Sequence, residues 1–470
     1  MSKQFKPTQS SDVFVGRRKQ IDNVLQLFEK NKKKWLVHIT GDGGIGKTRF
    51  LQVLRNTIAE HEPVGAWQCT EMIDFYKPSN QTAFGLLNEI ARQVSLEFFG
   101  RFVEQRKVYD NVLRSEPDQA QQLEAFERVA NAFFEDLQDL LKTGRRIVLF
   151  FDTCEESQPV SHWLSWKLLV RLSNILEQVA ALARENKDVA VVQQPALLAI
   201  FAGRTPIPFQ KDLKKAILNI HLAPLTKNEM ADFFEKVEWY PHKINKKQLK
   251  ELFVRCAGRP LYMAMSYDWL ANEMGTVDEL LSTADSFSKK LVDWILRFRD
   301  QQSNVILASA LAWRRMEAGL LAKLLRISEP EAIQLFEDLS KYSFVKYRRP
   351  ATDDNFAGSF QLHDVMRNFV NEHTWPGEGR WTHKAMLQDV LSWYEKRIGD
   401  ESVITGKERP KFDEQRSLVT EYLYYKLLQD VNAGAEYGEM LFKRASYFID
   451  LSLCDLYNAE INRFVAELPD

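Results

Sequence analysis

The chain lacks the residue patterns that mark secreted, zinc-binding and membrane proteins. It has 470 residues but only four cysteines, scattered and without a CxxC pair, which favours buried thiols in a reducing compartment over disulfides or zinc ligands. No apolar run approaches the roughly 18 residues that span a bilayer. The polar N-terminus lacks the apolar core of a signal peptide. We therefore expect a cytoplasmic protein that does not associate with membranes.

Net charge and common hydrolase motifs are missing as well. The 63 Lys and Arg residues balance 64 Asp and Glu residues, so no global charge favours nucleic acid, although a local basic patch stays open. No Ser/His/Asp, Cys/His or HExxH pattern indicates nucleophilic or zinc chemistry. The length exceeds what one hydrophobic core supports, which predicts three or four domains.

What the chain does contain is a glycine-rich loop between a short apolar run, Trp35–Thr40, and a segment of helical periodicity, Arg49–His61. Strand, loop and helix are the context in which such a loop binds phosphate. Its glycines let backbone amides converge on a polyphosphate, and its lysine and threonine can reach the β and γ phosphates and Mg²⁺. The loop reads Gly41-Asp42-Gly43-Gly44-Ile45-Gly46-Lys47-Thr48. We predict that it binds ATP or ADP with Mg²⁺.

Charged residues follow two further strand-like runs. Ile147–Phe151 ends in Asp152, which at the carboxyl edge of a buried strand can hold Mg²⁺ together with Thr48. Glu155 and Glu156 come next, and either could orient or deprotonate the attacking water; the sequence leaves open which. Arg204 follows the run Leu197–Gly203 and is a candidate sensor of the γ-phosphate.

The pattern of elements predicts a multidomain protein that begins with an α/β P-loop domain around a parallel sheet. Strand-like runs at 35–40, 64–74, 147–152, 197–203 and 217–222 alternate with helical segments at 17–30, 49–61, 82–96 and 116–142. After Pro224 the pattern is helical, with Lys246–Met274 as one stretch. Helices between 290 and 341, followed by short runs at 344–347 and 359–362, indicate a winged helix.

With these residues in place, the chain resembles the STAND-class signalling ATPases, which include the NACHT and NB-ARC switches. Phe14-Val15-Gly16-Arg17 resembles the family's first motif, whose backbone borders the adenine, and Gly41–Thr48 matches its Walker A loop. Asp152-Thr153-Cys154-Glu155-Glu156 resembles the extended Walker B pattern of NACHT proteins. Thr153 stands where those proteins have a smaller residue, so we do not assign the chain to that subclass.

Two more motifs carry the resemblance beyond the P-loop domain. Gly258-Arg259-Pro260-Leu261 is similar to the family's GxP motif, whose proline packs on the base. Leu362-His363-Asp364 resembles its MHD motif, in which the histidine contacts the β-phosphate of ADP; on the residues alone, a His-Asp pair that starts a helix also suits capping. The resemblance implies that Phe14, Val15, Arg17, Arg49, Pro260 and His363 join the loop in binding nucleotide, with Lys47, Asp152, Glu155, Glu156 and Arg204 serving hydrolysis.

The resemblance predicts the following organisation: a disordered leader (1–12), a P-loop domain (13–225), a small helical domain (226–286), a winged-helix domain (287–376) and a helical C-terminal domain (377–470). The last part looks like a segment that leads into a tetratricopeptide-like sensor, so we expect the natural chain to continue beyond residue 470. The implied function is a slow ATPase switch. Its nucleotide lies between the P-loop domain and the helical and winged-helix domains, ADP holds it closed, and ATP permits self-association.

A rival interpretation is a DNA-binding ATPase that uses the winged helix. The expected recognition helix, Glu329–Lys341, has four acidic residues against one lysine, so it would repel phosphates, and we do not expect DNA binding. A metabolic kinase would need an acceptor pocket that the sequence does not reveal. The trigger, which we place on the C-terminal helices, and the downstream effector are not indicated by any motif.

Overall fold

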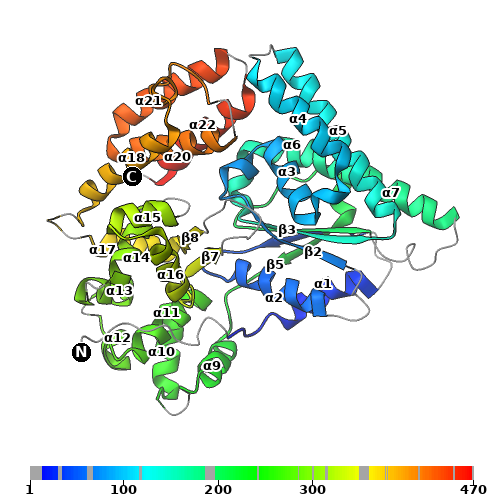
Figure 1. The fold of residues 1–470 in the computed structure, drawn as a ribbon. Helices are drawn as coiled ribbons and strands as arrows, with labels where there is room; N and C mark the ends of the chain where they lie inside the picture. Colours follow the sequence, from blue (N-terminus) through cyan, green and yellow to red (C-terminus); the bar gives the residue numbers. More distant parts are fainter. Residues whose placement is uncertain are drawn as a thin grey trace. The chain divides into compact units, whose positions relative to one another are not determined.

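Figure 1 shows the computed structural model of the chain, which divides into two compact units. The α/β unit comprises Arg17–Gly41, Lys47–Leu222 and Arg397–Asp470; the helical unit comprises Met1–Gly16, Asp42–Gly46 and Ala223–Lys396. The structure describes residues 13–29, 34–60, 67–115, 119–185, 196–240, 243–283, 285–298, 301–312, 316–348, 359–375, 377, 379, 381–410, 413–447 and 450–467. The expected leader, 1–12, lies outside these ranges.

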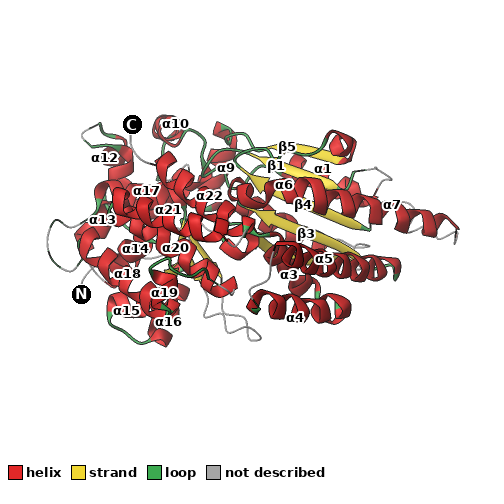
Figure 2. Cartoon of the chain, turned by 90° about the horizontal axis from the view of Figure 1, so that it is seen from above, coloured by secondary structure: helices red, strands yellow, loops and turns green. Residues whose placement is uncertain are grey.

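The α/β unit is built on a five-stranded parallel sheet, which Figure 2 shows in yellow. In the order β2-β3-β4-β1-β5, its strands are Trp67–Asp74, Arg146–Asp152, Leu197–Gly203, Leu36–Thr40 and Ile217–His221. All residues of β4 are buried, as are all but the first residue of β3, because helices cover both faces of such a sheet. The predicted fold class, with its parallel sheet, is confirmed.

Helices lie on both faces of this sheet (Figure 1). On one face are α1 (Arg18–Glu29) and α2 (Lys47–Glu60), and on the other are α3 (Ala83–Val94), α5 (Gln119–Lys142) and α7 (Leu169–Glu185). The sequence analysis did not anticipate α7 or the helix α4 (Gly100–Arg114), which packs against α5. Charged residues interrupt the apolar stripe of α4, so its sequence shows only weak helical periodicity.

The C-terminal helices also belong to the α/β unit. They include α19 (Glu401–Ile404), α20 (Asp413–Gln429), α21 (Val431–Tyr447) and α22 (Leu451–Glu467), preceded by α18 (His383–Ile398). Asp450 holds them together through buried ion pairs with Arg416 at 2.7 Å and Arg409 at 3.2 Å. Helix α20 packs against the 3₁₀ segment η2 (Pro78–Gln81), and α22 packs against η4 (Cys154–Val160), which follows β3. These helices are therefore docked on segments that flank the parallel sheet.

The helical unit begins with α9 (Lys227–Lys236), α10 (Lys246–Cys256), α11 (Pro260–Ala271) and α12 (Val277–Leu281). The prediction of a single helical stretch over Lys246–Met274 is wrong in one respect, because the segment is divided into α10 and α11. Ala257 and Gly258 have φ values of 49° and 66°, and Pro260 begins α11, where its missing N–H costs no hydrogen bond. The break places the proline at a helix N-terminus.

The rest of the helical unit combines helices with a small sheet. The helices are α13 (Phe287–Phe298), α14 (Gln301–Leu311), α15 (Ala318–Leu325), α16 (Glu329–Leu339) and α17 (Asp364–His373). The antiparallel sheet has the order β6-β8-β7, with strands Met316–Glu317, Ser359–Leu362 and Val345–Arg348. The strand β6 was not predicted, because two residues are too few to show a pattern. In the described part of the chain, no helix combines the length and apolar character that crossing a membrane requires.

Candidate nucleotide-binding site

The glycine loop follows β1 directly and runs into α2, as the sequence predicts. Gly44 and Gly46 have φ values of 75° and 90°, a backbone conformation that favours glycine and turns amides toward a common centre. Lys47 starts α2, and its Nζ donates a hydrogen bond to the carbonyl of Gly41 at 2.7 Å. The ammonium thus lies over the start of the loop, where it suits a phosphate chain.

Thr48 and Asp152, the two predicted magnesium ligands, lie together at the carboxyl edge of the sheet. The Thr48 hydroxyl donates to Asp152 Oδ2 at 2.7 Å, although the residues are 104 positions apart. Asp152 is buried, and its Oδ1 accepts from the backbone N–H of Thr153 at 2.9 Å. A hydroxyl and a single carboxylate fit Mg²⁺, which takes few protein carboxylates and completes its shell with water and phosphate. The described residues contain no group of three or more His, Cys, Asp or Glu side chains placed to hold a metal ion.

The segment after Asp152 departs sharply from the strand. Thr153 is buried with a φ of 58°, a left-handed conformation that is costly for a β-branched residue. This conformation explains why a small residue would suit the position. Burial, with smaller contributions from the Glu155 and Asp152 charges, raises the pKa of the Cys154 thiol well above its usual value. Cys154 therefore stays a protonated thiol and is a packing residue.

Glu155 and Arg204 are brought together beside this segment. Glu155 Oε2 accepts from the backbone N–H of Arg204 at 2.9 Å, and Oε1 lies 3.2 Å from Arg204 Nε. Gly203 makes this possible, because a Cβ there would lie 3.0 Å from Cys154 Cβ and 3.1 Å from Glu155 Oε2. The two predicted residues thus form one ion pair at the end of β4.

Glu156 has a different environment. Its Oε2 pairs with Arg463 Nη2, and Arg463 Nη1 lies 3.1 Å from Glu460 Oε2. Both partners belong to α22. Sequence reasoning missed Arg463 because no local motif signals a contact between residues so far apart in the chain.

In the helical unit, the GxP proline lies next to the glycine loop. A Cβ on Gly46 would be 3.9 Å from Pro260 Cγ, and the N–H of Leu261 lies 3.4 Å from the Gly44 carbonyl oxygen. A Cβ on Gly44 would also lie 3.7 Å from Val365 Cγ2. The beginnings of α11 and α17 are therefore packed on the loop residues Asp42–Gly46.

His363 occupies the N-cap position of α17. Its Nδ1 accepts a hydrogen bond from the Val365 backbone N–H at 3.3 Å, so the capping interpretation of this residue is confirmed. In the neutral ring this arrangement assigns the hydrogen to Nε2. Capping therefore orients the imidazole with a donor that suits a phosphate oxygen, and the two interpretations of His363 are compatible.

The remaining predicted residues border these elements. The carbonyl of Phe14 accepts from Lys236 Nζ of α9 at 3.1 Å, Val15 is half-buried, and Arg17 is buried with a φ of 66°. Asp42 opens a turn in which its carbonyl accepts from the Ile45 N–H at 3.4 Å. Arg49 lies in the first turn of α2. Gly41 and Gly43 complete the loop.

The site can be compared with known proteins. Residues 13–183 match the family model of the AAA ATPase domain, and no curated protein matches the chain. Among solved structures, the chain is similar to a STAND protein with a tetratricopeptide repeat sensor from Pyrococcus horikoshii, at 14% identity and a TM-score of 0.45. That match covers 98% of this chain and 65% of the other, so the chain spans about two thirds of its length.

Two other similar structures are origin recognition proteins. The Aeropyrum pernix ORC2 protein, in ADPNP and ADP complexes, is 14% identical with a TM-score of 0.32, and the match covers 78% of this chain and 96% of that one. The Drosophila ORC bound to DNA is 11% identical with a TM-score of 0.34, and the match covers 77% of this chain and 96% of that one.

The matched segment contains the motifs from which a nucleotide site was predicted. It includes Phe14–Arg17, the glycine loop and the strand that ends in Asp152. The prediction of a P-loop ATPase is confirmed for the segment that matches the AAA ATPase domain model, residues 13–183.

Proposed function

We propose that the chain is a nucleotide-dependent switch of the STAND type, which binds ATP or ADP with Mg²⁺ and hydrolyses ATP slowly. The observation that carries this proposal is the contact between Thr48, which ends the glycine loop, and Asp152 at the end of β3, at 2.7 Å. This pair is placed to hold Mg²⁺ with a nucleotide bound to the loop. The resemblance of the motifs to those of STAND proteins extends the proposal from binding to switching.

We propose for each site residue the role that the sequence predicts. Lys47 would neutralise phosphate charge, and Thr48 with Asp152 would hold Mg²⁺, which supplies further charge compensation when bound. Glu155 or Glu156 would orient water, and Arg204 would contact the γ-phosphate. Phe14, Val15, Arg17 and Pro260 would border the base. Lys47 and Asp152 are the most direct targets for mutation.

His363 would recognise the β-phosphate through Nε2, in the ADP-bound state. A hydrogen bond to a charged group contributes about 1.5–3 kcal/mol, whereas inverting a 1:99 equilibrium takes about 5.5 kcal/mol. His363 alone therefore cannot operate the switch. A trigger on the C-terminal helices, or self-association in the ATP state, must supply the rest.

The proposal includes the domain organisation predicted from the sequence. We assign 13–225 to the P-loop domain, 226–286 to a helical domain, 287–376 to a winged-helix domain and 377–470 to the start of a sensor region. The helices α14 to α16 and the antiparallel sheet β6-β8-β7 supply the elements that a winged helix needs. The four cysteines are free thiols, which supports a cytoplasmic location.

Two measurements test the switch: light scattering reports self-association, and chromatography of the released nucleotide identifies which nucleotide was bound. Replacing His363 with Ala should raise ATP occupancy or self-association relative to wild type. His373→Ala, at the other end of α17 where the ring contacts Ser288 Oγ at 2.9 Å, is the matched control. Unchanged nucleotide retention and oligomeric state in the His363 variant would count against this role.

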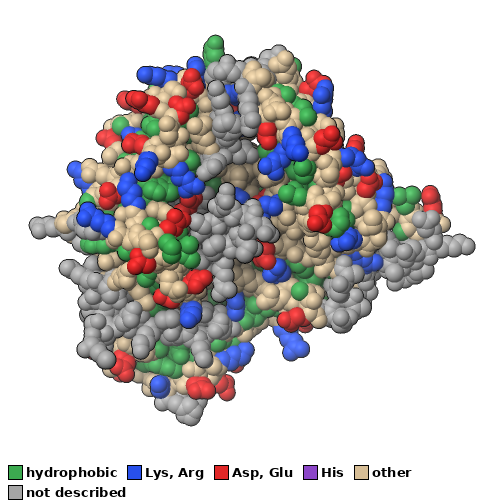
Figure 3. Space-filling model, viewed as in Figure 1, with side chains coloured by type: hydrophobic (Ala, Val, Ile, Leu, Met, Phe, Trp, Pro, Cys, Tyr) green, Lys and Arg blue, Asp and Glu red, His purple; other side chains and the backbone are tan. Residues whose placement is uncertain are grey.

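The alternative function, DNA binding through the winged helix, is less well supported. Helix α16 carries Glu329, Glu331, Glu337 and Asp338 and no basic residue. On the face shown in Figure 3, acidic and basic side chains are interspersed and do not form a single basic patch. Fluorescence anisotropy with duplex DNA at two salt concentrations decides between the functions, because phosphate contacts make affinity strongly salt-dependent.

A further inference from the structure

The two glutamates after Asp152 have separate partners, and we propose that this separation divides their roles. Arg463 is a positioning residue that holds Glu156, and with it η4, to the C-terminal helices. Glu155 is then the glutamate that serves hydrolysis. This inference rests on the proposed ATPase function and resolves a choice that the sequence leaves open.

The position of Glu155 follows from the register of the sheet. Gly203 of β4 pairs with Thr40 of β1, and Thr40 directly precedes the glycine loop. Because Glu155 bonds both the N–H and the guanidinium of Arg204, it lies at the end of β4, next to the end of β1. The Arg204 side chain is 41% exposed, whereas that of Glu155 is 16% exposed. The guanidinium of this ion pair is therefore the group that a phosphate oxygen can reach from solvent.

Glu156 has a more enclosed arginine partner than Glu155, although the two glutamate side chains are similarly exposed. The exposed fractions are 14% for the Glu156 side chain, 12% for Arg463 and 0% for Glu460. The Arg463 guanidinium therefore pairs with two carboxylates that water hardly reaches. Removing it would leave both negative charges near each other without this cation, which is strongly unfavourable. Glu156 is thus committed to the contact with α22.

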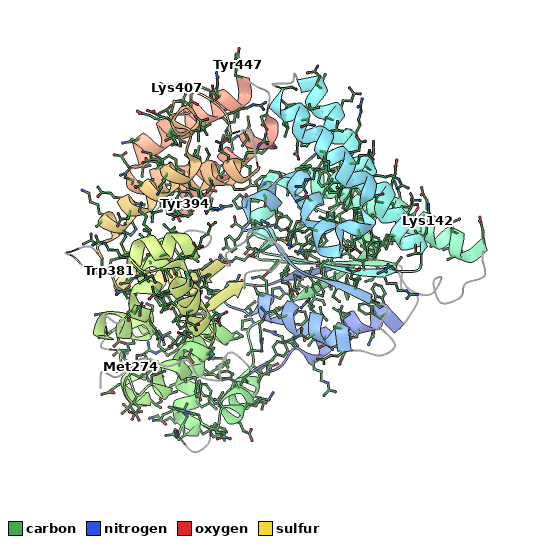
Figure 4. The ribbon with its side chains drawn as sticks, in the orientation of Figure 1. Lys142, Met274, Trp381, Tyr394, Lys407 and Tyr447 are labelled. Carbon is green, nitrogen blue, oxygen red and sulfur yellow. The ribbon has the colours of Figure 1, made fainter. Side chains whose placement is uncertain are left out.

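The contact links the C-terminal helices to hydrolysis. Glu155 and Glu156 are neighbours in the same short element, η4, so displacing one displaces the other. Helix α22 packs against η4, and α20 packs against η2, which itself contacts η4. On the outer side of these helices, Lys407 and Tyr447 point away from the bundle, and Tyr447 is 74% exposed (Figure 4). A partner that moves α22 would therefore shift Glu155 through Arg463 and Glu156.

Hydrogen exchange of the full chain without nucleotide tests the tether directly. Arg463→Ala and Glu156→Gln should each speed exchange of the Cys154–Val160 amides by about tenfold or more, because both free the same element. The double variant should add nothing to either single change. Lys443→Ala, which removes the exposed pair with Glu439 on α21, is the matched control and should exchange as wild type does. Unaltered η4 exchange in Arg463→Ala would refute the proposal.

Steady-state kinetics test the division of roles. Glu155→Gln should lower kcat by about 10²–10⁴-fold with nucleotide affinity kept, as expected for loss of a general base. Arg463→Ala and Glu156→Gln should each lower kcat by only about tenfold, by misplacing Glu155, with KM unchanged. Arg463→Lys should recover part of this loss, and the charge-exchanged double variant Glu156→Arg with Arg463→Glu should recover more.

Opposite results would overturn the inference. If Glu156→Gln lowers kcat as strongly as Glu155→Gln while Arg463→Ala does not, Glu156 is the catalytic residue. The conservative variants keep the test valid if Arg463→Ala does not fold. A failure of the proposed ATPase function would give a different result. Lys47→Ala would then bind nucleotide as tightly as the wild type does, regardless of how fast the η4 amides exchange.

Discussion

Gly203→Ala places a methyl group where the site has no room for it. The added Cβ would meet Cys154 Cβ at 3.0 Å, Glu155 Oε2 at 3.1 Å and the Glu155 backbone nitrogen at 3.2 Å. The Gly203 backbone is not in the left-handed region, so the cost is steric only. Overpacking of this kind destabilises a fold by about 1–3 kcal/mol. Because two of the three atoms belong to Glu155, we also expect kcat to fall as this residue is displaced.

Urea unfolding and ATPase assays measure the two effects of Gly203→Ala. Gly100→Ala is the matched control, since a Cβ at Gly100 has no heavy atom within 4 Å and the residue starts helix α4. Alanine there should be neutral or stabilising by about 0.4–1 kcal/mol. Wild-type stability and wild-type kcat in Gly203→Ala would refute the close packing of η4 on β4.

Three further predictions concern the loop and two buried charge clusters. Gly46→Ala should destabilise the fold by about 1–2 kcal/mol, because a φ of 90° strains alanine even though the added Cβ would have room, with Pro260 Cγ 3.9 Å away; urea unfolding measures this. Burial alone raises the pKa of Glu89, but the hydrogen bond from Arg92 and the charge of Lys77 outweigh it and lower the pKa from 4.5 to about 2. This lowered pKa should add about 3 kcal/mol to the free energy of unfolding above pH 4.5, and the added stability should be lost as the pH falls toward 2. The urea midpoint of Glu89→Gln should therefore not show this decrease. Asp450→Asn leaves two buried arginines without their shared carboxylate and should destabilise α20 to α22 by about 3–5 kcal/mol, which hydrogen exchange of these helices measures.

The parts of the fold that the sequence predicts are those with strong local patterns. The apolar runs that end at Asp152 and Gly203 have strand length and are bounded by polar residues, so their burial follows directly. The glycine loop is contiguous, and its spacing alone predicts which residues approach phosphate. The contact between Thr48 and Asp152 was also predictable, because parallel strands align their carboxyl ends at one edge.

Other features depend on tertiary contacts that no local pattern records. The pairing of Glu156 with Arg463 requires the C-terminal helices to dock on η4, and nothing near Arg463 signals that partner. The separate roles of Glu155 and Glu156 stayed open for the same reason. The break between α10 and α11 was missed although Gly258 and Pro260 mark it, because apolar residues continue with helical spacing on both sides. For His363, the structure shows the capping bond to Val365, whereas phosphate contact remains a proposal.

Calorimetric titration of the wild-type protein and Lys47→Ala with ATP in the presence of Mg²⁺ tests the central claim most directly. We predict saturable binding to the wild type at one site per chain and no measurable binding to the variant, with circular dichroism showing that the variant remains folded. Equal affinity of the two proteins for ATP would contradict the account.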